Sequence, residues 1–276
     1  MTWKLGYHAN CWGPLGGDAV GVTSIKDLTY RTFGDMGRAV REIGEAGYEG
    51  VEMFDGNLAD FADDRDALRS ILHGAGVRLI AAYAGANFIF PDVFPDEMAR
   101  VERAATLAAE MGAEHLVVGG GAKRHGGPRE GDYDRLCEGL DAVVELAEAH
   151  GLRAHYHPHL TTLAERPEEV ARVLDGCRID FCPDTAHLAA AGGDPAAMIR
   201  EHANRISYVH LKGWRREPFA FTPLDEGDLD TGGVVGALEE IGYDGWVLTE
   251  LDAWPDPAEG ARRSRAFLDR ARMASA

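Results

Sequence analysis

Four polar residues directly follow four apolar runs in the second half of the chain. His157 follows RAHY, Asp184 follows IDFCP, His210 follows ISYV and Glu250 follows WVLT. Their separations fit successive strand-helix-strand units, so we expect the four side chains to converge at one end of a barrel. Two imidazoles and two carboxylates that meet at one point are typical of a divalent-metal site.

Each of these residues also has a structural interpretation. His157 and His210 are candidates for histidines that serve only the core, and Asp184 is a candidate cap for the helix after it. Glu250 follows so apolar a run that its carboxylate is costly to bury without a cation. Four such residues at four consecutive strand ends favour metal binding over four unrelated roles.

The elements that must position these residues are short β-like runs that alternate with helical patterns. The predicted strands cover residues 3–8, 50–54, 77–83, 115–118, 153–157, 179–182, 205–210 and 245–250. Apolar residues at helical spacing predict helices over 35–45, 63–72, 96–111, 133–149, 167–174, 195–203 and 234–241. This alternation predicts an α/β fold, a (β/α)8 TIM barrel, with residues 1–276 in a single domain.

The rim that carries the active site in such barrels is expected to hold further residues. Glu52 lies near the end of the predicted strand 50–54 and belongs on the same rim. Long connections at 9–33, 85–94 and 212–232 are expected to cover the site as lids. The aromatic residues that these connections carry are Trp12, Phe88, Phe90, Trp214 and Phe219.

Composition restricts the partners and the location. The formal net charge of −18 repels polyanions, so nucleic acid is an unexpected partner. The sequence contains no apolar stretch of signal-peptide or membrane-spanning length, so we expect a cytoplasmic protein without a membrane partner. The four cysteines form no CxxC pair, which predicts reduced thiols. The sequence leaves the oligomeric state open, a homo-oligomer included.

Motifs from about residue 150 onward resemble those of the xylose-isomerase-like barrels, and most closely those of the inosose dehydratases. The motifs are HYHPHLTT, PDTAHLAAAGGDP, NRISYVHLKGWR, PLDEGDLD and GWVLTELDAWPDP. The early segment GYEGVEMF resembles the same family more loosely. The resemblance implies one divalent ion held by His157, Asp184, His210 and Glu250, and a small polyol or keto-sugar substrate. Mn²⁺ and Co²⁺ are the expected ions, while Zn²⁺ and Fe²⁺ also suit mixed nitrogen and oxygen ligands.

His157 distinguishes among the reactions of this family. The isomerase and epimerase branches that the chain resembles usually carry a glutamate at this place, whereas the dehydratase branch carries histidine. Replacing a carboxylate by a neutral imidazole makes the ion a stronger Lewis acid. We therefore expect a metal-dependent lyase that removes an α-proton from a keto-sugar or keto-cyclitol, stabilises the enediolate and eliminates a β-substituent.

Candidate roles follow for the other polar and aromatic residues of the rim. Glu52, His187 and Lys212 are the predicted catalytic residues. Each has an alternative role. Glu52 could orient substrate hydroxyls, His187 could support a metal ligand, and Lys212 could form a salt bridge. The residues predicted to bind substrate are His8, Trp12, His159, Trp214 and Trp254. Hydrophobic packing is the alternative for the tryptophans, and a solvated loop is the alternative for His159.

Other functions remain to be compared with a lyase. A sugar isomerase or epimerase of the same family is the main alternative, followed by β-eliminating cleavage of a 3-keto-glycoside. A non-catalytic barrel that binds metal or sugar is a further alternative. A DNA-repair endonuclease of this family needs extra histidines, and the segments 54–57, 83–87 and 212–232 contain none.

Overall fold

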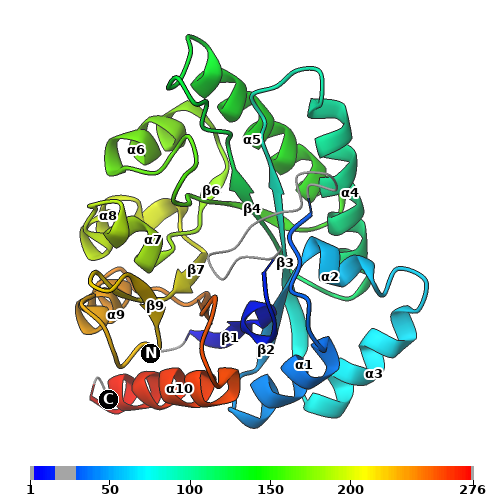
Figure 1. The fold of residues 1–276 in the computed structure, drawn as a ribbon, viewed down its shortest axis with the longest axis vertical. Helices are drawn as coiled ribbons and strands as arrows, with labels where there is room; N and C mark the ends of the chain where they lie inside the picture. The colour runs from blue at the N-terminus through cyan, green and yellow to red at the C-terminus, as the bar shows by residue number, and fades with distance from the viewer. Residues whose placement is uncertain (1–2, 16–28, 275–276) are drawn as a thin grey trace.

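The computed structural model describes residues 3–15 and 29–274, and within them eight parallel strands form a barrel surrounded by helices (Figure 1). The strand order is β6-β5-β4-β3-β2-β1-β10-β7. The two edge strands, β6 and β7, meet through an isolated parallel bridge between Asp184 and His210. The predicted (β/α)8 TIM barrel is confirmed.

The barrel strands match the predicted runs closely. They are β1 Lys4–His8, β2 Gly50–Phe54, β3 Arg78–Ala86, β4 His115–Gly120, β5 Arg153–His157, β6 Asp180–Phe181, β7 Tyr208–Leu211 and β10 Trp246–Thr249. The longer helices are α1 Met36–Glu45, α3 Arg65–Ala75, α4 Phe94–Glu110, α5 Asp132–Ala149, α6 Pro167–Gly176, α9 Thr231–Glu240 and α10 Pro257–Ala274. The short helices are η1 Ala9–Trp12, α2 Asp55–Ala59, α7 Thr185–Ala190, α8 Pro195–Glu201 and η2 Ala203–Arg205.

Aspartates begin several of the helices. In each case a side-chain oxygen accepts a hydrogen bond from a backbone N–H three residues later, which satisfies one of the unpaired donors of the first turn. These caps are Asp35, Asp64, Asp184, Asp194 and Asp230. The structure thus shows the capping role predicted for Asp184. Because Asp184 caps α7, it also fixes where the chain turns after β6.

Side chains fill the interior of the barrel at the end opposite the predicted metal ligands. A Cβ atom added at Gly6 would lie 2.6 Å from the side chain of Ile80, and one added at Gly50 would lie 2.5 Å from it. Leu248 and Trp246 complete this layer and are buried. The barrel is therefore packed below the site, and its chemistry is confined to the carboxyl ends of the strands.

The predicted lid segments differ from the structure in two respects. The segment 212–232 contains an antiparallel hairpin, β8 Gly213–Arg215 and β9 Ala220–Thr222, where a continuous loop was expected. Phe88 is buried, and its ring occupies the space beside Gly139 of α5, so its assignment to a lid is wrong. Residues 16–28 of the predicted lid segment 9–33 lie outside the described residues.

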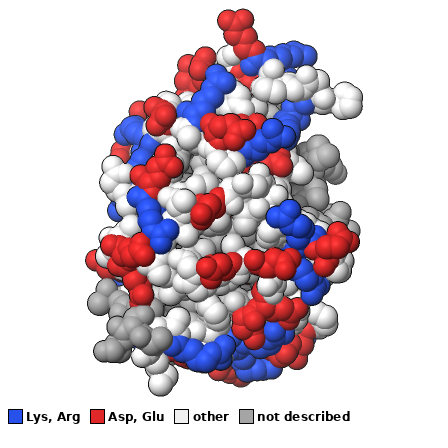
Figure 2. Space-filling view, turned by 90° about the vertical axis from the view of Figure 1, so that its left-hand side faces the viewer, with Lys and Arg blue, Asp and Glu red and all other residues white. Residues whose placement is uncertain are grey.

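The surface mixes charges of both signs. Lysine and arginine side chains lie among aspartates and glutamates on the face seen in Figure 2. Ion pairs among the described residues include Arg200 with Glu240 and Lys123 with Glu165. Among the residues that the structure describes, no helix combines the length and the apolar character needed to cross a bilayer.

Candidate metal centre

The four predicted ligands lie together at the carboxyl end of the barrel. His157 ends β5, Asp184 follows β6, His210 lies in β7 and Glu250 follows β10. One ligand atom from each side chain lies within 4.8 Å of those from the other three. All four residues are buried, with Glu250 the most exposed at 7%. The structure thus forms a compact cluster from residues that are far apart in the sequence.

The donor atoms of the cluster suit a divalent ion. His157 Nε2 lies 3.4 Å from Asp184 Oδ2, and both atoms are buried without a hydrogen-bond partner. His210 Nδ1 lies 2.6 Å from Glu250 Oε2. Buried donors that lack protein partners are expensive unless a cation or a proton satisfies them. Two imidazoles and two carboxylates can therefore hold a metal ion here.

The local backbone explains why Asp184 can serve two purposes. Its Oδ1 accepts a hydrogen bond of 2.8 Å from the backbone N–H of His187 and so caps α7, while Oδ2 faces His157. The backbone N–H of His210 donates to the carbonyl oxygen of Pro183 at 3.0 Å. The contact that closes the barrel is consequently the same contact that brings Asp184 and His210 together.

Lys212 lies behind the cluster and is fully buried. Its Nζ lies 2.8 Å from Asp252 Oδ1, 3.3 Å from Glu250 Oε1 and 3.8 Å from Asp184 Oδ2. Burial alone would lower the pKa of Lys212, but these carboxylates outweigh it and raise the pKa above its usual value. The ammonium group is therefore charged at neutral pH and balances part of the negative charge of the cluster.

Two members of this network escaped the sequence analysis. Asn10 Nδ2 lies 3.0 Å from both Glu250 Oε1 and Asp252 Oδ1, and so bridges the two carboxylates. A second carboxylate two residues after Glu250, in the motif TELD, was the available signal for Asp252. Asn10 follows β1 within η1, and its position depends on a turn that carried no recognisable motif.

The carboxylates of the cluster are held in their ionised form. Burial would raise the pKa of Glu250, but Lys212 and His210 outweigh it and hold the pKa well below its usual range. Burial has the same tendency at Asp184, where Lys212 and His157 keep the pKa low. Ionised oxygens are the form that ligates a metal, so the electrostatic environment favours cation binding before any ion arrives.

Glu52 lies deeper in the barrel than the cluster and is fully buried. Its Oε1 lies 3.1 Å from His210 Nε2 and 3.3 Å from His8 Nε2, and its Oε2 accepts a hydrogen bond of 2.8 Å from the hydroxyl of Tyr208. Burial would raise the pKa of Glu52, but His210 and His8 outweigh it and lower the pKa. Tyr208, which the sequence analysis missed, therefore donates to an ionised carboxylate.

Two further histidines pack beside the ligand His157. The rings of His159 and His187 lie 3.8 Å apart between centroids, and His187 lies 5.6 Å from the ring of His157. His159 Nδ1 lies 2.7 Å from the carbonyl oxygen of Leu160, so Nδ1 carries the proton and Nε2 is left as an acceptor. His187 Nε2 faces the ammonium of Lys212 at 3.5 Å, which leaves the proton on the buried, unpartnered Nδ1.

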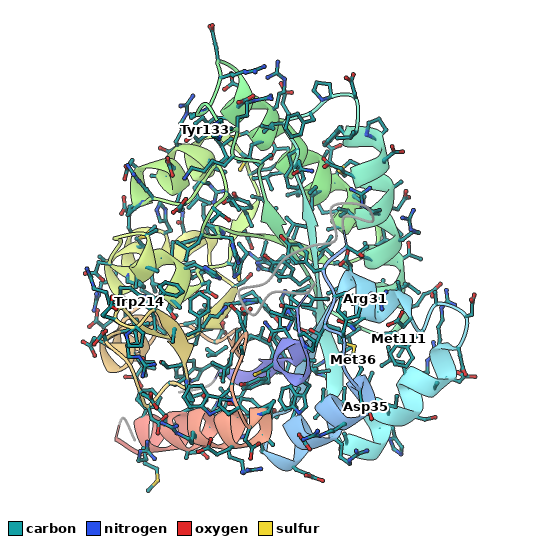
Figure 3. All side chains as sticks on the ribbon, viewed as in Figure 1. Arg31, Asp35, Met36, Met111, Tyr133 and Trp214 are labelled. Carbon is teal, nitrogen blue, oxygen red and sulfur yellow. The ribbon has the colours of Figure 1, made fainter. Side chains whose placement is uncertain are left out.

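The three predicted tryptophans make their contacts elsewhere. The Nε1–H of Trp12 donates to Glu42 of α1 at 2.6 Å, and that of Trp254 donates to Glu259 of α10 at 3.0 Å. Trp214 lies beside α8 and α9 in Figure 3. These contacts belong to the helical layer. The ring of Trp12 also packs edge-on against Tyr7, which is the hydrophobic packing that the sequence offered as an alternative to substrate binding.

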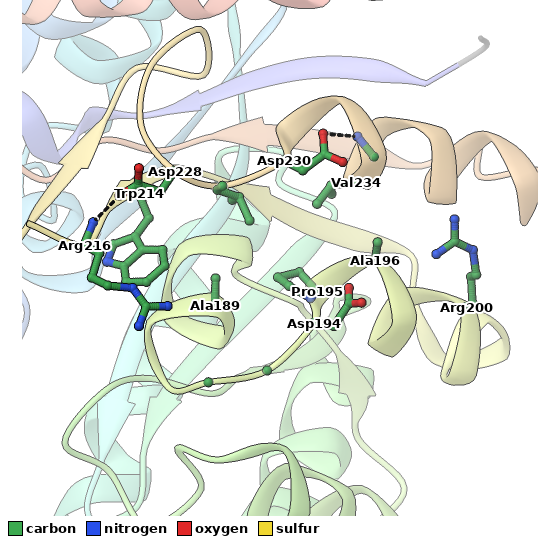
Figure 4. Close-up of a pocket in the computed structure, with 14 residues that line it drawn as sticks. Ala189, Asp194, Pro195, Ala196, Arg200, Trp214, Arg216, Asp228, Asp230 and Val234 are labelled. Atoms are coloured by element: carbon green, nitrogen blue, oxygen red, sulfur yellow. Dashed lines mark hydrogen bonds between the residues drawn. The ribbon is translucent and has the colours of Figure 1, made fainter.

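Trp214 lines a separate pocket of about 530 Å³ between α7, α8 and α9 (Figure 4). The guanidinium of Arg216 lies 5.3 Å above its ring, and the backbone N–H of Arg216 donates to Asp228 at 2.8 Å. Aspartates that cap α8 and α9, Asp194 and Asp230, face the same pocket. These contacts lie between the helices, and none of them places Trp214 as a lid over the metal cluster.

Of the residues predicted from the sequence, the structure brings together the four ligands with His8, Glu52, His159, His187 and Lys212. The sequence model of the family described as xylose isomerase-like TIM barrel matches residues 40–271. The chain belongs to this family.

Relatives of this xylose isomerase-like barrel have named activities. The inosose dehydratase of Geobacillus kaustophilus is 26% identical over 269 residues, which cover 84% of this chain and 86% of that protein. Solved structures of similar fold include 3-keto-D-glucoside 4-epimerase from E. coli, with a TM-score of 0.74, 18% identity and coverage of 97% and 99% of the two chains. An L-ribulose 3-epimerase has a TM-score of 0.72, 18% identity and coverage of 99% and 97%. The protein is an enzyme, and a lyase or an isomerase or epimerase activity fits these relatives.

Proposed function

We propose that this enzyme is a divalent-metal-dependent lyase that acts on a keto-sugar or keto-cyclitol and eliminates a β-substituent, as a dehydratase does. The observation that carries the proposal is the buried cluster of His157, Asp184, His210 and Glu250. The relatives named inosose dehydratase support the lyase reaction and the substrate class. Mn²⁺ or Co²⁺ is the proposed ion, because the donor set mixes imidazole and carboxylate.

A divalent ion held by these four side chains would supply Lewis acidity, which makes the hydrogen next to a substrate carbonyl group more acidic. Lys212 contributes a fixed positive charge beside the same carboxylates, in a site that excludes water from its fully buried Nζ. Preorganised positive charge stabilises the negative charge that develops when a proton leaves carbon. The two cationic contributions therefore act in the same direction.

The two packed histidines provide complementary proton-transfer atoms. His159 presents Nε2 as an acceptor, because its Nδ1 proton is committed to the Leu160 carbonyl oxygen. His187 presents a protonated Nδ1, because Lys212 faces its Nε2. We assign removal of the α-proton to His159 Nε2 and protonation of the departing hydroxyl to His187 Nδ1. This assignment keeps the predicted catalytic role of His187 and gives His159 more than substrate binding.

An epimerase is the second candidate, since the same proton abstraction followed by return of the proton to carbon inverts a centre. The epimerases among the structures of similar fold favour it. Cleavage of a 3-keto-glycoside shares the first step and differs in its leaving group. The three reactions are thus distinguished by the fate of the product and not by the site that starts them.

The experiment is a screen of the metal-reconstituted enzyme against inososes, ketohexoses and 3-keto-glycosides, with Glu250→Ala as the matched control. Elimination gives an enone product with a new ultraviolet absorption band, whereas epimerisation gives an isomer that carries solvent deuterium and no such band. We expect the band with a keto-cyclitol and its loss in Glu250→Ala. Turnover by chelated wild type at the reconstituted rate would refute the metal-dependent mechanism.

A further inference from the structure

Glu52 lies among polar side chains of strands β1 and β7. Its Oε2 accepts from the Tyr208 hydroxyl at 2.8 Å, and its two oxygens lie 3.1 and 3.4 Å from His210 Nε2. The backbone N–H of Asn10 donates to His8 Nδ1 at 3.1 Å, so the proton of neutral His8 is on Nε2, 3.3 Å from Glu52. The Tyr208 hydroxyl of β7 thus donates to the carboxylate, and the Nε2 atoms of His8 in β1 and His210 in β7 lie close to its other oxygen.

The surroundings of Glu52 do not suit a proton carrier. The side chain is fully buried; its Oε2 accepts from the Tyr208 hydroxyl, and its Oε1, which has no hydrogen-bond partner among the described residues, is enclosed between His8 Nε2 and His210 Nε2. A general base needs a lone pair within hydrogen-bond reach of the substrate proton that it removes. Glu52 faces the interior of the barrel through Tyr208, whose ring packs 4.8 Å from His115 at the amino end of β4.

His210 lies between two carboxylates on opposite edges of its ring. Nδ1 faces Glu250 at 2.6 Å, on the side of the metal cluster, and Nε2 faces Glu52 at 3.1 Å. A carboxylate that accepts the second N–H of a ligating imidazole fixes its tautomer, its orientation and its basicity. We propose that Glu52 is a positioning residue that holds His210 with Nδ1 directed at the metal, an inference that rests on the proposed metal function of the cluster.

The test measures metal binding and does not require a substrate. Co²⁺ is titrated into the chelator-stripped full-length protein, and its affinity is followed by the visible absorption band of the bound ion. We expect Glu52→Gln, which keeps the shape and removes the charge, to weaken Co²⁺ binding about 10- to 100-fold. Glu97→Gln is the matched control, because Glu97 is likewise a fully buried glutamate but accepts hydrogen bonds from Asn87 and Phe88 and not from the cluster.

The outcomes separate this inference from the function on which it rests. Unchanged Co²⁺ affinity in Glu52→Gln would overturn the positioning role, even if turnover were lost, and equal weakening in Glu97→Gln would do the same. Wild-type protein that binds no Co²⁺ would instead refute the metal site itself. If Glu52→Gln fails to fold, judged by near-ultraviolet circular dichroism, Tyr208→Phe replaces it. That variant removes a donor to Glu52, and at least about 3-fold weaker binding supports the role, whereas wild-type affinity refutes it.

Discussion

Lys212→Met should destabilise the metal-free protein much more than the loss of an ordinary surface charge. The Nζ of Lys212 lies 2.8, 3.3 and 3.8 Å from three carboxylate oxygens and is fully buried. At an effective dielectric constant of about 20, each pair contributes roughly 4 to 6 kcal/mol of attraction, and desolvation of the ammonium offsets much of the total. Methionine preserves the chain length but leaves the carboxylates facing one another.

The expected net loss is about 3 to 5 kcal/mol, the range found when one partner of a buried ion pair is removed. Burial raises the pKa of Asp252 to about 7, so this carboxylate takes up a proton at little cost once the ammonium is gone, and the loss should lie at the lower end of that range. For a protein of this size the melting temperature should fall by roughly 6 to 10 °C. The assay is thermal unfolding in the presence of a chelator, followed by circular dichroism.

The control for this prediction is Lys123→Met. Lys123 is 46% exposed and pairs with Glu165 at 2.7 Å, so its removal should cost at most about 1 kcal/mol. The double variant Lys212→Met/Asp252→Asn should recover part of the loss, because it removes the carboxylate nearest to the missing ammonium. The reasoning is refuted if Lys212→Met loses no more stability than Lys123→Met.

Three further predictions concern the metal, pH and packing. Mn²⁺ at about a thousand times its dissociation constant should stabilise the wild type by about 4 kcal/mol in thermal unfolding, and the same addition should leave Glu250→Ala unchanged. Burial lowers the pKa of His8 and of His115 to about 4, from an ordinary value of about 6.5, so both stay neutral in the fold. The unfolded chain binds these protons more readily, so stability should be lost as pH falls from about 6.5 to 4. His115→Gln should reduce that loss by up to about 3 kcal/mol in urea titrations across this window, and an unchanged pH slope would contradict the burial argument. Gly139→Ala should cost about 1 to 3 kcal/mol by urea denaturation, because its Cβ would lie 2.6 Å from the ring of Phe88, and wild-type stability would show that the ring yields freely.

The sequence predicted the barrel because each of its strands is local. Strands β2 and β5 have the predicted bounds, because turn glycines, Gly47 and Gly151, precede the two runs and Pro158 directly follows β5. Strand β6 is only Asp180–Phe181, because its side of the barrel meets β7 through the isolated bridge between Asp184 and His210, which no local pattern encodes. The helix α10 was absent from the predicted helices, and its many charged residues make it more polar on average than the other long helices.

The composition of the metal cluster also followed from the sequence, whereas its supporting contacts did not. Any side chain directly after a parallel strand of a barrel must point towards the common rim, so His157, Asp184 and Glu250 were identified by position alone. Asn10 has no such signal, and Asp252 has only that of a second carboxylate near Glu250, because their contacts depend on how the turns after β1 and β10 fold against each other.

The sequence by itself determined the fold class, the end of the barrel where the chemistry occurs and the kinds of ligand gathered there. Only the tertiary structure decided which partner each side chain meets. It directed Glu52 to His210, paired Lys212 with Asp252 and placed Trp214 in a separate pocket between helices. The reason is physical: strand periodicity fixes the face on which a side chain lies, but its contacts depend on packing between residues that are distant in the sequence.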